Sequence, residues 1–187
     1  MSTEMAPIPF IGVRAQRNRT PTGRRTATPA RRAALYLAFG SEQQAGQTAE
    51  ARGQWVGPDG RVRTHEAVLA WAQEGALRHR YTFQAVLSVQ QGALEPEDFA
   101  QAMETGGLIP DWRLLVHRDT DYRHAHVLFF RDHRFQKETF LGWQEQVRQE
   151  LVRLEEQQLS SHAAQEELAL EQGKGRERAL ESEVGLG

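Results

Sequence analysis

The sequence feature that most constrains the fold is the stretch 112–132, WRLLVHRDTDYRHAHVLFFRD. Two apolar-rich runs, 112–117 and 124–130, flank a short polar centre, and this pattern is typical of a β-hairpin. A two-residue loop at Thr120–Asp121 fixes the pairing of the two predicted strands, because each residue then faces one partner across the hairpin. The stretch therefore predicts a rigid two-stranded platform.

Three histidines lie on one face of this predicted hairpin. The pairing places His117 opposite His124, and His126 follows two residues later, so its side chain points to the same side. Three converging imidazoles suit a divalent metal with three protein ligands and open positions for a substrate. The alternative is that each histidine is an ordinary hydrogen-bonded strand residue. Asp119, on the same face, either orients a ligand imidazole or bonds its own backbone in the turn.

The N-terminal part of the chain is strongly basic, although the formal net charge of the whole chain is only −2. Residues 11–40 contain seven arginines and no acidic residue, whereas glutamates outnumber basic residues from Gln144 onward. An arginine can hold a phosphate through two hydrogen bonds and displace its counterions, so this segment is a candidate surface for nucleic-acid phosphates. The alternative is an arm that only keeps the chain in solution. The candidate DNA-binding residues are Arg14, Arg17, Arg19, Arg24, Arg25, Arg31 and Arg32.

The composition excludes several classes of site. The chain has no cysteine, which excludes disulfides and thiolate metal sites and fits a reducing cytoplasm. No apolar stretch approaches the roughly 18 residues that a membrane helix needs, and residues 1–10 do not have the pattern of a signal peptide. We therefore expect a cytoplasmic protein without membrane insertion.

The periodicity of the remaining chain predicts an α+β fold. Residues 1–28 are rich in proline, threonine and arginine, which predicts a basic, largely disordered arm with at most a short strand near 9–14. Residues 29–158 form the predicted folded domain: four or five antiparallel strands, the histidine hairpin at their centre and helices on one face. Residues 159–187 are expected to form a helical to disordered acidic tail, because their apolar stripe is thin.

A helix is predicted from Thr28-Pro29 to Gly40, since threonine favours the N-cap position and proline favours the first turn. Leu35, Tyr36 and Phe39 share one side of it at helical spacing. A tyrosine in such a position is most often an anchor with a buried ring and a hydroxyl in water.

The motif HRDTDYRHAH at 117–126, followed by apolar residues, resembles the histidine motif of plasmid mobilisation relaxases, which belong to the HUH endonucleases. The segment RRAALYLAFG, which contains Tyr36, resembles the helical segment in which relaxases present their nucleophilic tyrosine. FQAVLSVQQGALEPEDFAQAM resembles their strand, turn and helix, so the resemblance spans about 30–150. The chain departs from the pattern at Arg131-Asp132, where many relatives have an asparagine.

The resemblance implies a DNA relaxase, an endonuclease and transesterase that nicks one DNA strand in plasmid or integrative-element mobilisation. Tyr36 is then the nucleophile and Asp119 a second catalytic residue. The three histidines then hold a divalent ion, Mg or Mn by resemblance, although imidazoles also accept Zn, Co or Ni. The implied partners are single-stranded DNA at a transfer origin and a relaxosome accessory or coupling protein.

Two other functions remain open. Rolling-circle replication initiators and transposases of the HUH superfamily share the histidines, but they place the tyrosine after them, whereas Tyr36 precedes them. The other function is that of a catalytically inactive DNA-binding remnant of a relaxase, because the chain is short for a complete mobilisation protein. Tyr122, in the predicted turn, competes with Tyr36 for the role of nucleophile, while Tyr81 is expected to pack against the sheet.

Overall fold

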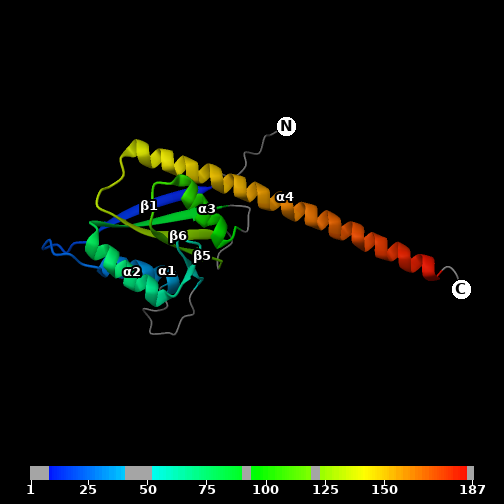
Figure 1. Cartoon of the computed structure of the whole chain (residues 1–187), viewed down its shortest axis with the longest axis horizontal. Coiled ribbons are helices and arrows are strands. Elements are labelled where there is room, and N and C mark those ends of the chain that lie inside the picture. The colour runs from blue at the N-terminus through cyan, green and yellow to red at the C-terminus, as the bar shows by residue number, and fades with distance from the viewer. Residues whose placement is uncertain (1–8, 41–51, 90–93, 119–122, 185–187) are drawn as a thin grey trace.

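The computed structural model describes residues 9–40, 52–89, 94–118 and 123–184, with side chains described as far as residue 172. These residues form an α+β domain in which helices flank one antiparallel sheet (Figure 1). Six strands are described, in the order β1-β4-β6-β5-β2-β3. The strands are β1 (Phe10–Arg17), β2 (Trp55–Val56), β3 (Val62–Arg63), β4 (Tyr81–Ser88), β5 (Trp112–His117) and β6 (His124–Arg131). The helices are α1 (Thr28–Phe39), α2 (His65–Arg78), α3 (Pro96–Gly106) and α4 (Lys137–Val184).

The histidine hairpin lies at the centre of the sheet, as the sequence predicts. β5 and β6 pair antiparallel, and β6 pairs with β4 on its other side. In this register His117 faces His124 and Leu115 faces His126, which confirms the predicted pairing. The turn of the hairpin, residues 119–122, lies outside the described residues.

Helices cover both faces of the sheet, whereas we expected helices on one face only. The side chains of β6 alternate, so that Ala125, Val127 and Phe129 pack in the core that includes α3 and α4. Leu128 and Phe130 pack instead against α1 and α2. Both sets are apolar, so each face of the central strands needs a covering layer. The histidines of β6 follow the same alternation as Leu128 and therefore share the face that α1 and α2 cover.

α1 packs on the sheet through small side chains rather than through the side we expected. Tyr36 is 52% exposed, and Leu35 and Phe39 are only partly buried. Because alanine side chains are short, the helix axis can approach the sheet closely, and main-chain atoms of α1 come near the hairpin. The buried residues of α1 are Ala30, Ala33, Ala34, Leu37 and Ala38.

The basic N-terminal segment is partly built into the folded domain, which differs from the arm that we expected over residues 1–28. β1 pairs with β4 along eight residues, because every second side chain of FIGVRAQR meets the core. Ile11 is buried, and its carbonyl accepts a hydrogen bond of 2.8 Å from Gln144 Nε2 on α4. Beyond the strand, Asn18 is buried and donates from Nδ2 to the His79 carbonyl at 3.0 Å.

α4 begins within the domain and then leaves it. Beyond Gln158 every described side chain is exposed, and the helix projects away from the sheet (Figure 1). The helix continues to Val184, so it covers most of the tail at 159–187 for which we expected a helical to disordered structure. None of the helices in the described part of the chain combines the length and apolar character needed to cross a membrane. The residues that anchor the first part of α4 are Trp143, Val147, Leu151 and Leu154.

Candidate metal centre

The three histidines of the central hairpin form one compact cluster, as the sequence predicts. The ring centroids of His117 and His126 are 4.5 Å apart, and each lies 5.0 Å from the centroid of His124. One ligand nitrogen from each ring can be chosen so that all three lie within 4.8 Å of one another. This spacing allows one divalent ion to contact all three side chains, so the residues present fit a metal centre.

A main-chain atom of α1 orients the most buried imidazole of the cluster. His117 is 3% exposed, and its Nε2 lies 2.7 Å from the carbonyl oxygen of Leu37. A carbonyl only accepts, so Nε2 carries the proton and donates it. The neutral ring then has its lone pair on Nδ1, which is the atom that would contact a metal. Metal-ligating histidines are commonly held by such a hydrogen bond through their second nitrogen.

The surroundings of His126 favour the neutral, metal-binding form of its ring. Burial lowers the pKa of His126, and the neighbouring His117 and His124 lower it further. The positive charges of Arg14 and Arg52 act in the same direction, and the pKa falls to about 3. A proton therefore does not compete with a metal for this nitrogen at neutral pH.

Tyr36 precedes Leu37, whose carbonyl contacts His117, and its side chain lines a cavity that includes none of the three histidines. The cavity has a volume of about 430 Å³, and its other lining residues include Arg14, Arg32 and Gln84. Arg14 donates from Nη2 and Nε to Gln84 Oε1, at 2.6 Å and 3.2 Å, so its guanidinium is held at this spot. Because Tyr36 is half exposed, it is not the buried anchor that the helix pattern allowed as an alternative.

The end of α1 is fixed against the chain that returns to the sheet. Gly40 has φ +66° and ψ −155°, a conformation that is essentially restricted to glycine. A Cβ at this position would lie 2.3 Å from Arg52 Nη2, and the Arg52 amide donates to the Ala38 carbonyl at 2.8 Å. These contacts hold Arg52 near the histidines, where its charge acts on His126.

Glu95 contacts the hairpin on both sides of its turn. From the sequence, this residue was identified only as part of a helix start. Its two carboxylate oxygens form ion pairs with Arg118 at the end of β5 and with Arg123 before β6. Glu95 is also the N-cap of α3, where it forms a capping box with Asp98. α3 is thereby tied to both strands that carry the histidines. Glu95 is far from Arg118 and Arg123 in the sequence. The only sequence signal for these ion pairs is the positive charge of the two arginines that flank the turn.

The remaining predicted residues divide into three groups. Asp119 and Tyr122 lie outside the described residues. Tyr81 pairs with Arg131 at the opposite end of β6 from the histidines, and its ring lies 6.2 Å from that of Phe83, as expected for a packing role. Of the seven predicted arginines, Arg14 and Arg32 lie beside Tyr36, and Arg31 is exposed on α1. The others belong to the segment that ends β1 and leads into α1, and they are Arg17, Arg19, Arg24 and Arg25.

Comparison of the chain with protein-family models, with curated proteins and with solved structures found no match. The groups available for chemistry are three imidazoles that can share an ion and, in the cavity lined by α1, β1 and β4, an exposed phenol and two guanidinium groups.

Proposed function

We propose that the protein is a DNA relaxase, which nicks one DNA strand by tyrosine transesterification during plasmid or integrative-element mobilisation. The observation that carries the proposal is the hydrogen bond between His117 and the Leu37 carbonyl. It joins the helical turn that bears Tyr36 to the histidine cluster, which supports the proposal that Tyr36 acts as the nucleophile together with a metal held by the histidines. The resemblance of the histidine and tyrosine segments to relaxases supports the same function.

The three histidines would hold the divalent ion, for which we propose Mg or Mn, while Zn, Co and Ni are also compatible with imidazole ligands. A divalent ion bound there would withdraw charge from a scissile phosphate and stabilise its transition state. Arg14 and Arg32 lie in the cavity beside Tyr36 and supply positive charge for the phosphate oxygens. We propose Asp119 as a second catalytic residue, which orients a ligand imidazole.

The reaction begins with the Tyr36 hydroxyl, because a phenol is a nucleophile once its proton is removed. Its oxygen forms a bond to phosphorus while the bond from phosphorus to the 3′ oxygen breaks. The 3′ oxygen takes up a proton and leaves as a hydroxyl, and the 5′ end remains linked to Tyr36 as a phosphotyrosine. One phosphoester is exchanged for another, so the strand can be rejoined after transfer.

The order of the residues separates the relaxase from its relatives within the HUH superfamily. Rolling-circle initiators and transposases place the tyrosine on a helix that follows the histidines. Here the first described helix after the hairpin is α4, whose sequence contains no tyrosine. The partner that we propose is a single strand at a transfer origin, together with an accessory or coupling protein of the relaxosome.

Formation of a covalent adduct tests the proposal. The purified protein is mixed with labelled single-stranded oligonucleotides from the neighbouring DNA, with and without Mn, and the products are separated on a denaturing gel. We expect the wild type to form a Mn-dependent protein–DNA adduct and Tyr36→Phe to form none. Tyr81→Phe is the matched control, because it removes one hydroxyl at the far end of the sheet.

Tyr122→Phe completes the test, because Tyr122 is the competing nucleophile. We expect this variant to form the adduct at the level of the wild type. An adduct that survives in Tyr36→Phe and disappears in Tyr122→Phe would overturn the assignment of the nucleophile. A folded wild-type protein that binds metal and the strand but never forms an adduct would favour the inactive remnant.

A further inference from the structure

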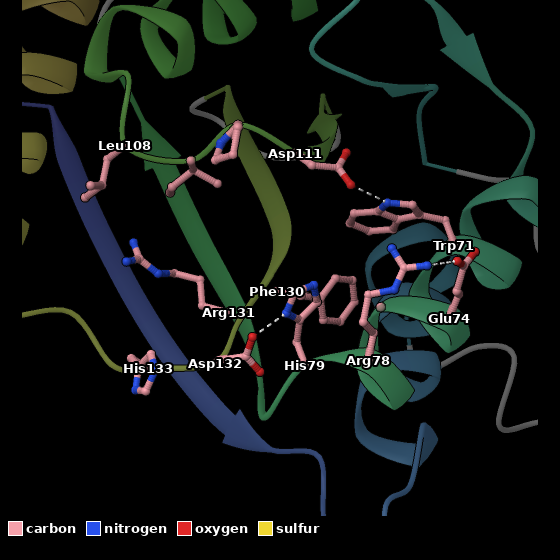
Figure 2. Close-up of a pocket in the computed structure, with 13 residues that line it drawn as sticks. Trp71, Glu74, Arg78, His79, Leu108, Asp111, Phe130, Arg131, Asp132 and His133 are labelled. Carbon is pink, nitrogen blue, oxygen red and sulfur yellow. Dashed lines mark hydrogen bonds and ion pairs between the residues drawn. The ribbon is translucent and has the colours of Figure 1, made fainter.

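A second cavity lies at the end of β6 that is remote from the histidines. It has a volume of about 450 Å³, within the range of small-molecule sites. β5 begins at Trp112, opposite Phe129, so Phe130 and Arg131 extend past it and border the cavity (Figure 2). Arg131 lies five positions after His126 on β6, which corresponds to about 17 Å of extended strand.

The cavity has a rigid aromatic wall. The rings of Trp71 and Phe130 lie 4.9 Å apart at an angle of 60°. Phe130 packs directly on α2 at Gly75, where a Cβ would lie 2.4 Å from its ring. Two contacts fix the position of the Trp71 indole. Its Nε1 donates a hydrogen bond to Asp111 Oδ2 at 2.9 Å, and the Arg113 guanidinium lies over the ring, 4.4 Å from its centroid. Such a wall offers a flat apolar surface to a planar group.

Three carboxylates, Glu74, Asp111 and Asp132, and two arginines line the cavity, and Glu74 forms an ion pair with Arg78. Asp111 pairs with Arg113 at 2.6 Å, and Asp132 accepts from His79 Nδ1 at 3.0 Å (Figure 2 draws the second contact). Arg131, by contrast, has no carboxylate partner among the described residues. Its guanidinium lies 4.1 Å from the centroid of the Phe135 ring, and its Nη1 is shielded from solvent without a hydrogen-bond partner. Arg131 is therefore the arginine of the lining that is placed to pair with a phosphate next to the cavity.

Further arginines continue from Arg131 across this end of the sheet. A neighbouring hollow of about 290 Å³ is lined by Arg17, Arg19 and Arg80 around Tyr81. Asp132, which follows Arg131 in the chain, accepts hydrogen bonds from the His79 side chain and the Arg80 amide. These bonds lower its pKa, and the charge of Arg25 contributes. We call this surface the arginine end, and its residues are Arg17, Arg19, Arg25, Arg80, Arg131 and Arg134.

We propose that the arginine end and its cavity form a second binding site for single-stranded DNA, in which the cavity receives one base against Trp71 and Phe130. The arginines contact the phosphates of the adjoining nucleotides. Aromatic stacking combined with a basic groove is the usual way in which proteins hold single strands. The inference rests on the proposed function, because it takes the same DNA strand as the ligand. In addition, the DNA would be bound at Arg131, about 17 Å along β6 from the histidines. This separation would set the distance between the bound base and the nicked phosphodiester.

Tryptophan fluorescence tests this site without any chemistry on the DNA. The chain has four tryptophans, and Trp71 is partly exposed whereas the other three are at most 2% exposed. Stacking of a base should therefore quench Trp71 selectively. In EDTA, oligothymidylate is expected to quench the wild type with saturation and to leave Trp71→Phe almost unchanged.

The salt dependence of binding tests the arginines. We expect Arg131→Gln and Arg80→Gln each to weaken binding and to lower the slope of log affinity against log salt by about 0.7, the value for one phosphate contact with a single strand. Arg80 is exposed, so Arg80→Gln keeps the test valid if Arg131→Gln fails to fold. Arg153→Gln, on the exposed side of α4, is the matched control and should leave the slope unchanged.

Two outcomes would overturn the second site. One is a salt slope that stays at the wild-type value in Arg80→Gln and in any folded Arg131→Gln. The other is quenching by a polyglutamate peptide with no quenching by oligothymidylate, which would indicate a protein partner instead. The assay contains no metal and breaks no bond, so Tyr36→Phe should be quenched like the wild type. Failure of the transesterase proposal would appear only in the adduct assay.

Discussion

The metal-free protein should lose stability as the pH falls, because of His126. The pKa of its imidazole is about 3 in the folded protein, compared with 6.5 for an unperturbed histidine. Between these values the unfolded chain binds a proton that the folded chain does not bind, so the free energy of unfolding decreases towards low pH. One pKa unit corresponds to about 1.36 kcal/mol, so lowering the pH from 6.5 to 5 costs about 2 kcal/mol.

Urea unfolding at pH 7 and pH 5 in the presence of EDTA measures this effect. The comparison is between wild type and His126→Gln, which keeps a polar side chain that does not titrate. We expect wild type to lose about 2 kcal/mol more than the variant between the two pH values.

His162→Gln is the control for this experiment. His162 lies on the exposed part of α4, with Nδ1 3.9 Å from Glu166 Oε1, so this variant shows how much of any change comes from the loss of a histidine outside the cluster. If wild type and His126→Gln lost the same stability between pH 7 and pH 5, the imidazole would not be held neutral by burial, and the reasoning would be refuted.

Three further outcomes are expected. The double variant His124→Ala/His126→Ala should lose Mn binding in a calorimetric titration, and an affinity equal to that of wild type would contradict the metal centre. A chain that ends at Ser160 should still form the DNA adduct, because the described side chains beyond it are exposed; a folded truncation without activity would count against this. Gly40→Ala should lower the free energy of unfolding by about 1–3 kcal/mol, because its backbone conformation excludes a side chain and Arg52 occupies the space; unchanged urea unfolding would show that the turn adapts.

The hairpin could be predicted from the sequence because its information is local. Alternation of apolar and polar residues sets the face of each strand, and the short turn sets the register, so the positions of His117, His124 and His126 follow directly. The packing side of α1 could not be predicted in this way. Alanines carry little hydrophobic signal, so the larger residues Leu35 and Phe39 dominated the pattern even though the alanines meet the sheet.

The contacts between segments that are distant in the chain also could not be predicted from the sequence. Glu95 reaches Arg118 and Arg123 only because α3 returns beside the hairpin, and many exposed acids could have made such a pair. The second cavity is assembled from α2, the end of β6 and the segment before β5, and no one segment carries its pattern. The length of the N-terminal strand was underestimated because the arginines in it and the prolines on either side of it are typical of a disordered arm, although Ile11 contributes to the core.

The hydrogen bond between Leu37 and His117 has a consequence for how this protein tolerates substitution. The acceptor is a main-chain carbonyl, so replacing the Leu37 side chain leaves the bonding atom in place, and an alanine scan would not detect the link. What the link requires is a short separation between helix and sheet, which Ala30 and Ala34 provide by being small. Chemical replacement of the peptide bond after Leu37 by an ester, which weakens that carbonyl as an acceptor, would expose the dependence. The tautomer of a proposed metal ligand is thus governed by residues that carry no functional group at all.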